Sequence, residues 1–444
     1  MKILVTFFLI ISSALVAQNK AVILIKSGKP INQEFRIVSI TEPLLNTEKV
    51  LGRIKFNQSQ REFITLDFEE EVIPVLVKSA NFEKEVYLTP NDTITLIIEG
   101  EELTLNPINA LNNAIEVINT ASNDFFLRAS KREGAPLPIK QTRGFCDSMR
   151  THFNDTNNAY VRQYLIYKMA YVEISANARS RKEASKKYFN NNSIPLNNPV
   201  WCDAFITLYQ GYFVQYLNSK KGGVLKGLFS EKKGWADILN EFSKDTFLFS
   251  SEIKKLVLIQ GMNELFQTKQ PNKQYYLSLL KDAKITEKST EINTILTALI
   301  VHYSRFEVGN IPPKLVVVDA QSGKEINLSA IKGKAIYFCY YPLFNQLTQQ
   351  EIIFLKGIYK KYQSKIEFVV VIDADPKTVE AASKNMALPF PMASSSSSSE
   401  SLNDWLERKD VINYMLIHSN GKIYQAPAEG PETGIEAAFL GLIK

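Results

Sequence analysis

The segment Asp319–Pro342 reads DAQSGKEINLSAIKGKAIYFCYYP, and its second half contains the uncharged run Ala335–Tyr341. A second apolar run, Ile366–Ile372, follows it, and Thr348–Tyr362 between the two runs has apolar residues at helical spacing. The stretch Phe368–Ile372 has no polar side chain, which is typical of a central strand covered on both faces. The order of strand, helix and strand predicts an α/β domain.

The same pattern extends from about Pro312 to the last residue, Lys444, and predicts one domain over residues 309–444. The further elements expected there are a strand, a helix, the two strands of a hairpin and a closing helix, at Lys314–Asp319, Asp375–Lys384, Tyr414–His418, Lys422–Tyr424 and Gly434–Ile443. The serine run Ser394–Ser399 is too polar to bury surface of its own, so it predicts a flexible loop inside this domain.

Helical periodicity dominates the preceding block, residues 106–308. The pair Asn198-Pro199 predicts a helix start, with Asn as the N-cap and Pro in the first turn. The other expected helices are Leu111–Lys131, Ile139–Phe153, Tyr160–Asn177, Ser251–Thr268 and Ile292–Tyr303. The basic run Arg179–Lys187 is most simply a solvated helix end. The block therefore predicts an all-α helical module.

An aromatic stripe follows Asn198-Pro199 at helical spacing. Its members are Trp201, Phe205, Leu208, Tyr212 and Tyr216, with Tyr209 and Phe213 beside them. Such a stripe can line a ligand groove, but it is more often part of a hydrophobic core. We interpret it as core.

Residues 18–105 contain short β-rich runs separated by turn residues. Seven strands are expected, at Ala21–Ile25, Phe35–Ile40, Val50–Phe56, Glu62–Phe68, Val72–Val77, Glu83–Leu88 and Thr93–Ile98. Strands of this length at intervals of roughly 8–12 residues predict an antiparallel β-sandwich. The block has no Cys, no His and no Gly-rich loop, so we interpret it as a structural or binding module.

The N-terminus, Met1–Gln18, reads MKILVTFFLIISSALVAQ. One Lys, an apolar run and a small residue before Gln18 predict a secretory signal peptide over residues 1–17, cleaved after Ala17. A membrane anchor is the competing interpretation, but the apolar run is shorter than the roughly 20 residues that cross a bilayer. The sequence thus predicts an exported protein, periplasmic or secreted, with no stable transmembrane anchor.

Composition excludes several classes of function. The 444 residues include 52 basic and 46 acidic residues, and a charge of +6 spread in this way does not form the basic stripe of a nucleic-acid-binding protein. The three His and three Cys are too scattered for a zinc site. We expect no nucleic-acid partner, no metal and no cofactor. Cys146 and Cys202 lie on different predicted helices, and the sequence leaves open whether they form a disulfide.

The C-terminal third resembles the thioredoxin fold of TlpA-like and peroxiredoxin-like envelope proteins. The resemblance rests on the order of the entry segment Asp319–Pro342, the amphipathic helix after it, the strand Ile366–Asp375 and the hairpin Met415–Tyr424. The layout of signal peptide, β module, helical module and thioredoxin-like module is also similar to multidomain members of this group. The resemblance implies thiol–disulfide chemistry at the start of the helix that follows Ala335–Tyr341.

That chemistry needs a thiolate at a helix N-terminus, where the helix dipole lowers the thiol pKa. A second Cys three residues further on resolves the mixed disulfide. Alignment on Phe338 places Leu343 and Gln346 at the two cysteine positions. Cys339 is the last cysteine of the chain, so no alignment supplies a thiol at or after the helix start. The family's cysteine pair is therefore missing.

Two other alignments lead to the same conclusion. Thr348-Gln349-Gln350-Glu351 is a capping box, which places Thr348 where the attacking Cys lies in the family. A peroxiredoxin alignment, suggested by Tyr341-Pro342-Leu343, places Gln349 or its neighbour at the peroxidatic position. The family's cis-proline is also missing, because Asp410–Tyr414, which includes Ile412, contains no Pro.

Cys339 is the remaining weak catalytic candidate. It is either a monothiol that forms mixed disulfides or an apolar filler of its strand, and we favour the filler because a strand interior lacks a helix dipole. We therefore expect a redox-inactive domain that binds an envelope protein or peptide, as the resemblance implies through main-chain pairing and a shallow apolar groove. The alternative is a thiol-disulfide oxidoreductase with residual monothiol activity through Cys339. A third possibility is that the N-terminal β module does the binding.

The candidate binding residues lie around the expected site. They are Tyr340, Tyr341, Phe344, Thr348 and Tyr414. The aromatic rings among them either line the binding surface or pack inward, and the sequence leaves both arrangements open.

Overall fold

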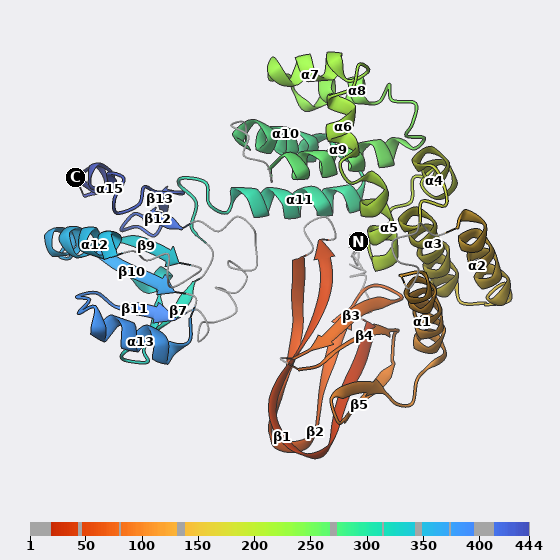
Figure 1. Cartoon of the computed structure of the whole chain (residues 1–444), viewed down its shortest axis with the longest axis horizontal. Helices are drawn as coiled ribbons and strands as arrows, with labels where there is room; N and C mark the ends of the chain where they lie inside the picture. Colours follow the sequence, from red (N-terminus) through yellow and green to blue (C-terminus); the bar gives the residue numbers. More distant parts are fainter. Residues whose placement is uncertain are drawn as a thin grey trace, which may run out of the picture. The chain divides into compact units, whose positions relative to one another are not determined.

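The computed structural model describes residues 19–42, 47–79, 81–130, 138–266, 273–312, 315–341, 349–372, 374–394 and 413–443. The chain divides into two compact units between Thr297 and Ala298, inside helix α11 (Thr290–Ser304) (Figure 1). The first unit combines the N-terminal sheet with the helices that follow it, and the second contains the α/β sheet. No helix in the described ranges has the length and apolar character that a membrane span requires.

The N-terminal strands form one six-stranded sheet. They are β1 (Asn19–Glu42), β2 (Thr47–Phe68), β3 (Ile73–Lys78), β4 (Glu83–Leu88), β5 (Thr93–Glu99) and β6 (Glu102–Leu105). The order is β4-β3-β1-β5-β6, and β2 pairs with β1. The pairing of β1 with β5 is parallel and the other pairings are antiparallel. The expected strands thus belong to a single mixed sheet, not to an all-antiparallel arrangement.

The first four expected strands are merged into two long ones, β1 and β2. Ser27-Gly28 and Asn57-Gln58 are among the turn residues that separate the expected strands, and they lie where the register of the continuous β1–β2 ladder is irregular. The hairpin continues through them because each half of β1 has a second partner. Val22–Ser27 pairs with β5 and Arg36–Val38 pairs with β3. Strand β6 was missed because its four residues are too few to show a period.

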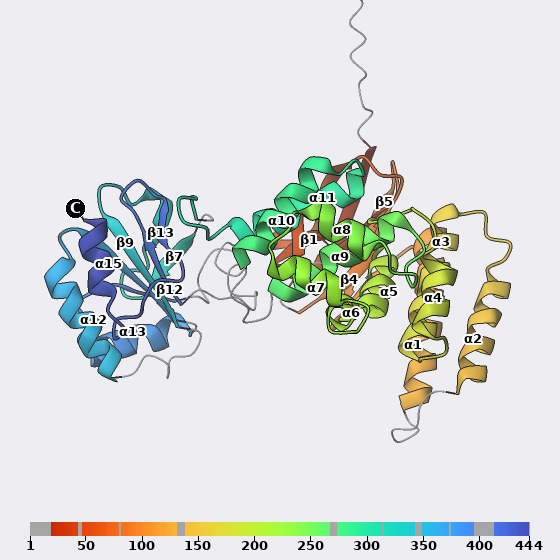
Figure 2. The ribbon, with the colours of Figure 1, turned by 90° about the horizontal axis from the view of Figure 1, so that it is seen from above.

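Ten helices of the first unit precede α11 in the described residues. They are α1 (Ala110–Ser130), α2 (Ile139–His152), α3 (Ala159–Ser175), α4 (Arg181–Tyr188), α5 (Pro199–Tyr209), α6 (Tyr212–Leu217), α7 (Gly223–Ser230), α8 (Trp235–Phe242), α9 (Ser251–Phe266) and α10 (Lys273–Thr286). Helices α1, α2 and α3 lie side by side in both views (Figures 1 and 2). Asn198 caps α5 through a hydrogen bond from the Trp201 N–H, as the sequence predicts.

Most of the aromatic stripe is core, as interpreted from the sequence, whereas Tyr212 and Tyr216 are partly exposed. Trp201, Phe205 and Tyr209 are at most 2% exposed, and the rings of Trp201 and Phe205 stack at 5.2 Å. The stripe spans two helices, because Gly211 has a left-handed backbone (φ +69°) that ends α5 and begins α6. An aromatic spacing alone does not reveal such a break.

The basic run Arg179–Lys187 is not simply a solvated helix end. Glu173 of α3 is fully buried and accepts hydrogen bonds from Arg150, Arg179 and Lys187. Tyr188 donates to the same carboxylate over 2.8 Å. A buried carboxylate needs such partners, because an unpaired buried charge is strongly destabilising. The run therefore supplies cations to an internal ion-pair network.

One side chain joins α1 to the edge of the N-terminal sheet. Asn112 accepts a hydrogen bond from the Tyr87 N–H over 2.9 Å and donates to the Tyr87 carbonyl over 2.8 Å. The amide thus pairs with β4 as the main chain of another strand does. Because Asn112 is 5% exposed, these bonds fix α1 against the sheet.

The second unit has a seven-stranded sheet in the order β13-β12-β9-β10-β11-β7-β8. Its elements are β7 (Val316–Asp319), β8 (Glu325–Asn327), β9 (Ala335–Tyr341), α12 (Gln349–Tyr362), β10 (Ile366–Ile372), α13 (Pro376–Asn385), β11 (Met392–Ser394), β12 (Tyr414–Ile417), β13 (Ile423–Gln425) and α15 (Ile435–Leu442). The two apolar runs are the parallel central pair β9 and β10. The expected serine loop lies outside the described residues, except for Ser394.

Alternate residues of β9 pack on opposite faces of this sheet. Tyr337, Cys339 and Tyr341 belong to the core that α12 and α15 cover. Ile336, Phe338 and Tyr340 belong to the core on the other face, with Leu315 and Leu328. The strand is buried over its whole length because both faces are covered. This arrangement brings one face of β9 to the start of α12.

Candidate functional site at the start of helix α12

The site lies where strand β9 faces the first turn of α12. Glu351, in that first turn, is 7% exposed. The phenol of Tyr341 on β9 donates to Oε1 of Glu351 over 2.8 Å. The phenol of Tyr414 on β12 donates to the same oxygen over 2.5 Å. Three elements of the fold thus meet at one buried carboxylate oxygen.

Aromatic packing surrounds this carboxylate. The rings of Tyr341 and Tyr414 meet edge to face at 6.2 Å, and Tyr414 stacks on Tyr337 at 6.3 Å. The Tyr337 phenol donates to the Glu429 carbonyl over 3.0 Å. Each of these three tyrosine hydroxyls has an acceptor, so the aromatic cluster is a satisfied polar network.

Burial sets the protonation of the tyrosines and of the thiol. Burial raises the pKa of Tyr341, and the nearby Cys339, Tyr414 and Glu351 raise it further. Burial and the hydrogen bond to Glu351 raise the pKa of Tyr414. The pKa of Cys339 is raised well above 9.0, chiefly by burial. The phenols therefore stay protonated as donors, and the thiol stays protonated at neutral pH.

Cys339 has none of the features that activate a thiol. It is 0% exposed and lies inside β9, and burial and the nearby Glu351 carboxylate at the start of α12 raise its pKa. A reactive cysteine is partly exposed and next to a cation or a helix dipole. Within the described ranges there is also no group of three or more His, Cys, Asp or Glu residues that could hold a metal. The arrangement can anchor the start of α12, and it lacks a thiolate nucleophile.

The structure places the predicted residues as follows. Tyr340 and Tyr341 are each 3% exposed, so both rings pack inward, which is the second of the two arrangements that the sequence left open. Tyr414 is partly exposed. Leu343, Phe344, Gln346, Thr348 and Ile412 lie outside the described residues, and so does the cap of α12. All three cysteines are free and buried, so Cys146 and Cys202 form no disulfide in this structure.

Two features of α12 were missed by sequence reasoning. Glu351 was expected only as part of a capping box, whereas its Oε1 accepts from two tyrosines. Ile353 and Phe354 are 68% and 42% exposed. The sequence did contain a signal for this exposure. Ile352 and Leu355 follow the helical period of the buried face, and Ile353 and Phe354 lie outside that face.

The family match lies in the C-terminal third of the chain. Residues 308–424 match the model of the AhpC/TSA family. The thiol-disulfide oxidoreductase ResA of Bacillus cereus is 28% identical over 104 residues, which are 22% of this chain and 58% of that protein. The chloroplastic peroxiredoxin Q of Gentiana triflora is 27% identical over 100 residues, which are 22% of this chain and 46% of that protein.

Solved structures cover a similar share of the chain. The thioredoxin domain of a thiol-disulfide oxidoreductase from Bacteroides vulgatus is 15% identical, with a TM-score of 0.27. That match covers 31% of this chain and 99% of the solved one. This chain spans little more than half the length of its curated Bacillus relatives. The family match and the curated relatives place residues 308–424 in the thioredoxin-like superfamily, with similarity to the AhpC/TSA family.

Proposed function

We propose that this is an exported protein whose thioredoxin-like domain has lost dithiol exchange and binds an envelope protein or peptide. One observation carries the proposal. Cys339 is the only thiol of the C-terminal unit, and it is fully buried inside a central strand. Dithiol exchange needs an exposed thiolate and a resolving cysteine, and this unit contains neither.

The start of α12 supports a binding role. In the thioredoxin-like redox proteins, this end of the helix carries the thiolate. Here its first turn contains Glu351, which two tyrosines hold in place. The neighbouring Ile353 and Phe354 expose large apolar side chains on the same helix. An adjacent apolar pair beside a rigid aromatic network is a suitable contact for an unfolded segment.

The alternative function is residual monothiol activity through Cys339. It is favoured by the names of the curated relatives, which are thiol-disulfide oxidoreductases. It requires that Cys339 react with a disulfide in the folded protein. The raised pKa and complete burial of this thiol oppose that requirement.

Alkylation of Cys339 distinguishes the two functions. The folded full chain is treated with iodoacetamide from pH 6 to 9, and labelling of each cysteine is followed by peptide mass spectrometry. We expect Cys339 to react only in denaturant, with no rise in rate near pH 8.5 in the folded protein. Rapid labelling in the folded chain, with an ordinary or lowered thiol pKa, would support the monothiol function.

Binding is tested with reduced, carboxymethylated lactalbumin, an unfolded polypeptide without free thiols. We expect the double variant Ile353→Asp/Phe354→Asp to bind it several-fold more weakly than the natural chain. Leu440→Asp is the matched control, because Leu440 is 52% exposed on another helix of the same unit. Equal binding by the natural chain and both variants would remove α12 as the contact surface.

Export rests on the sequence pattern of Met1–Gln18, which lies outside the described residues. We expect the mature protein in the envelope or medium to begin at Gln18, as N-terminal sequencing would report. A mature chain that still begins at Met1 would contradict cleavage.

A further inference from the structure

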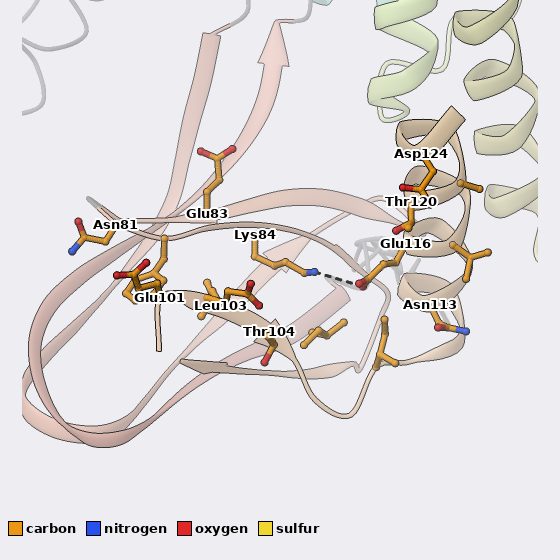
Figure 3. Close-up of a pocket in the computed structure, with 16 residues that line it drawn as sticks. Asn81, Glu83, Lys84, Glu101, Leu103, Thr104, Asn113, Glu116, Thr120 and Asp124 are labelled. Carbon is orange, nitrogen blue, oxygen red and sulfur yellow. Dashed lines mark ion pairs between the residues drawn. The ribbon is translucent and has the colours of Figure 1, made fainter. Parts of the chain in front are cut away.

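An open groove lies between strands β4 and β6 of the N-terminal sheet, far in sequence from the thioredoxin-like domain. The edge strands β4 and β6 come close to each other, and α1 runs beside them. The groove between them has a volume of about 990 Å³ (Figure 3). Residues 81–84 and 101–105 form its sheet side, and α1 from Asn113 to Asp124 forms the opposite side. Its size is that of a ligand or peptide site.

The pairing register shows that β4 turns main-chain groups toward open space. The Ser79 N–H donates to the Phe82 carbonyl, so the main-chain groups of Phe82 face β3. The main-chain N–H and C=O of Tyr87 are both hydrogen-bonded to the side chain of Asn112. Antiparallel strands alternate between inward and outward main-chain groups. The N–H and C=O of Glu83 and Glu85 therefore point away from β3, as those of Tyr87 do. Tyr87 is satisfied by α1, and in the described ranges no partner is seen for the N–H groups of Glu83 and Glu85.

Strand β6 presents the same kind of edge. The Asn106 N–H donates to the Thr95 carbonyl, so Asn106 faces β5. By the same alternation, Leu103 and Leu105 turn their main-chain groups away from β5. Strands β4 and β6 thus both present main-chain groups beside the groove, and an extended peptide can pair with such edges.

The groove is acidic although the chain as a whole is positively charged. The chain has a formal charge of +6, whereas the lining contains the carboxylates of Glu83, Glu101, Glu102, Glu116 and Asp124. Among the residues that the structure describes, the lining has one cation, Lys84, which is paired with Glu116 at 3.5 Å. Figure 3 shows Glu101 on the sheet side and Asp124 on α1. The excess of negative charge favours a basic partner.

Apolar contacts complete the groove. Ile108 and Val117 line it and are 37% and 40% exposed, and Phe82 lies at its end next to β4. An extended peptide places alternate side chains on opposite sides. Apolar side chains of such a peptide can contact these three apolar residues, while its basic side chains lie beside the carboxylates.

We propose that this groove binds an extended basic peptide segment of a partner protein. The segment pairs its main chain with an open edge of β4 or β6 and places Lys or Arg side chains against the acidic walls. This site is independent of the thioredoxin-like domain, so the proposal does not rest on the function proposed above.

The test uses the full chain and, as probe, the peptide TKVKVTKV-amide with fluorescein on its N-terminus, with binding followed by fluorescence anisotropy. Two control peptides isolate the two kinds of contact. One replaces each Lys with Glu, and the other carries N-methyl groups on alternate residues, which remove main-chain donors. We expect the probe to bind, both control peptides to bind at least about tenfold more weakly, and the affinity to fall as salt is added.

Matched variants locate the site. Glu101→Lys/Glu102→Lys reverses two charges at the start of β6, and we expect it to weaken probe binding at least about tenfold. Glu70→Lys/Glu71→Lys makes the same change at an exposed pair elsewhere in the β module and should change binding less than about twofold. Hydrogen–deuterium exchange should show that the probe slows exchange in β4 or β6.

Three results would overturn the proposal. The first is an equal loss of binding in both double variants, or binding of the Glu-substituted peptide that is as tight as binding of the probe. The second is concentration-dependent dimerisation that the probe does not displace, which assigns the edges to a second copy of the chain. The third is probe binding that occurs only after removal of residues 1–18, which would mean that the chain's own N-terminus occupies the groove.

Discussion

The phenol of Tyr414 donates a hydrogen bond to Oε1 of Glu351 over 2.5 Å and so ties strand β12 to the first turn of α12. Tyr341 donates to the same oxygen from β9. A thioredoxin-like redox site needs a thiolate near this helix start. Here the first turn contains a buried carboxylate, and one of its oxygens accepts hydrogen bonds from two neighbouring strands.

Glu351→Gln tests the anchoring role of this carboxylate. A neutral amide accepts hydrogen bonds more weakly than a carboxylate, so we expect α12 and β9 to lose about 1–2 kcal/mol of local stability. Hydrogen–deuterium exchange of the full chain measures this loss at the two elements. Glu380→Gln on α13 is the control, because Glu380 forms an exposed ion pair with Lys384. Unchanged exchange in α12 would show that Glu351 does not hold the helix.

A new cysteine at the start of α12 tests whether this helix end can still activate a thiol. Gln349 is the first residue of α12 and is exposed. We expect the thiol of Gln349→Cys to have a pKa below the free value of about 8.5 and to react faster than Cys339. Gly357→Cys is the matched control in the middle of the same helix, where a Cβ meets nothing within 4 Å. A thiol pKa at position 349 equal to that at 357 would contradict an activating helix end.

The sequence predicted the second unit well because its signals are local. Strands β9 and β10 were placed at their observed ends, since β9 is a run without charged residues and β10 is an apolar run interrupted only by Glu367. Strands β8 and β11 were missed, because three residues are too few for a period and their pairing is decided by distant neighbours. In the first unit, nothing local shows that β1 continues through Ser27-Gly28, because its second partners are far along the chain.

The candidate site was predicted less well, for a related reason. The absence of cysteines was readable from the sequence alone. The inward packing of Tyr340 and Tyr341 depends on whether both faces of β9 are covered, and that is a property of the assembled sheet. The contact of Tyr414 with Glu351 joins residues 63 positions apart, so no local pattern indicates it.

Asn112→Ala tests the joint between α1 and the N-terminal sheet. The change removes both hydrogen bonds to Tyr87 and leaves buried main-chain groups unsatisfied. We expect a loss of about 1–3 kcal/mol in the free energy of unfolding of the first unit. Urea unfolding followed by tryptophan fluorescence measures it, since Trp201 and Trp235 lie in this unit. Asn113→Ala, an exposed neighbour, should have little effect, and an equal loss in both variants would contradict the role of Asn112.

The ion-pair network of Glu173 should make the helices resistant to acid. Burial alone would raise the pKa of Glu173, but hydrogen bonds from Arg179, Tyr188 and Arg150 outweigh it and lower the pKa to about 2. The stabilisation is therefore complete above about pH 4.5 and is lost as the pH falls toward about 2. We expect Glu173→Gln to cost about 3 kcal/mol at pH 7, and less as the pH falls through that window.

Urea unfolding at several pH values between 7 and 2 measures this difference. Glu231→Gln is the control, because Glu231 forms an exposed pair with Lys233. Its effect should be small at every pH. A Glu173→Gln effect that stays constant from pH 7 to pH 2 would contradict the lowered pKa.

The central claim, that the thioredoxin-like domain has no dithiol exchange activity, is tested most directly by reduction of insulin with dithiothreitol. The full chain is compared with its Cys339→Ala variant and with dithiothreitol alone, and precipitation of the insulin B chain is followed by turbidity. We expect all three rates to be the same, because Cys339 is buried and has no resolving partner. A rate for the natural chain that clearly exceeds both others would contradict the claim.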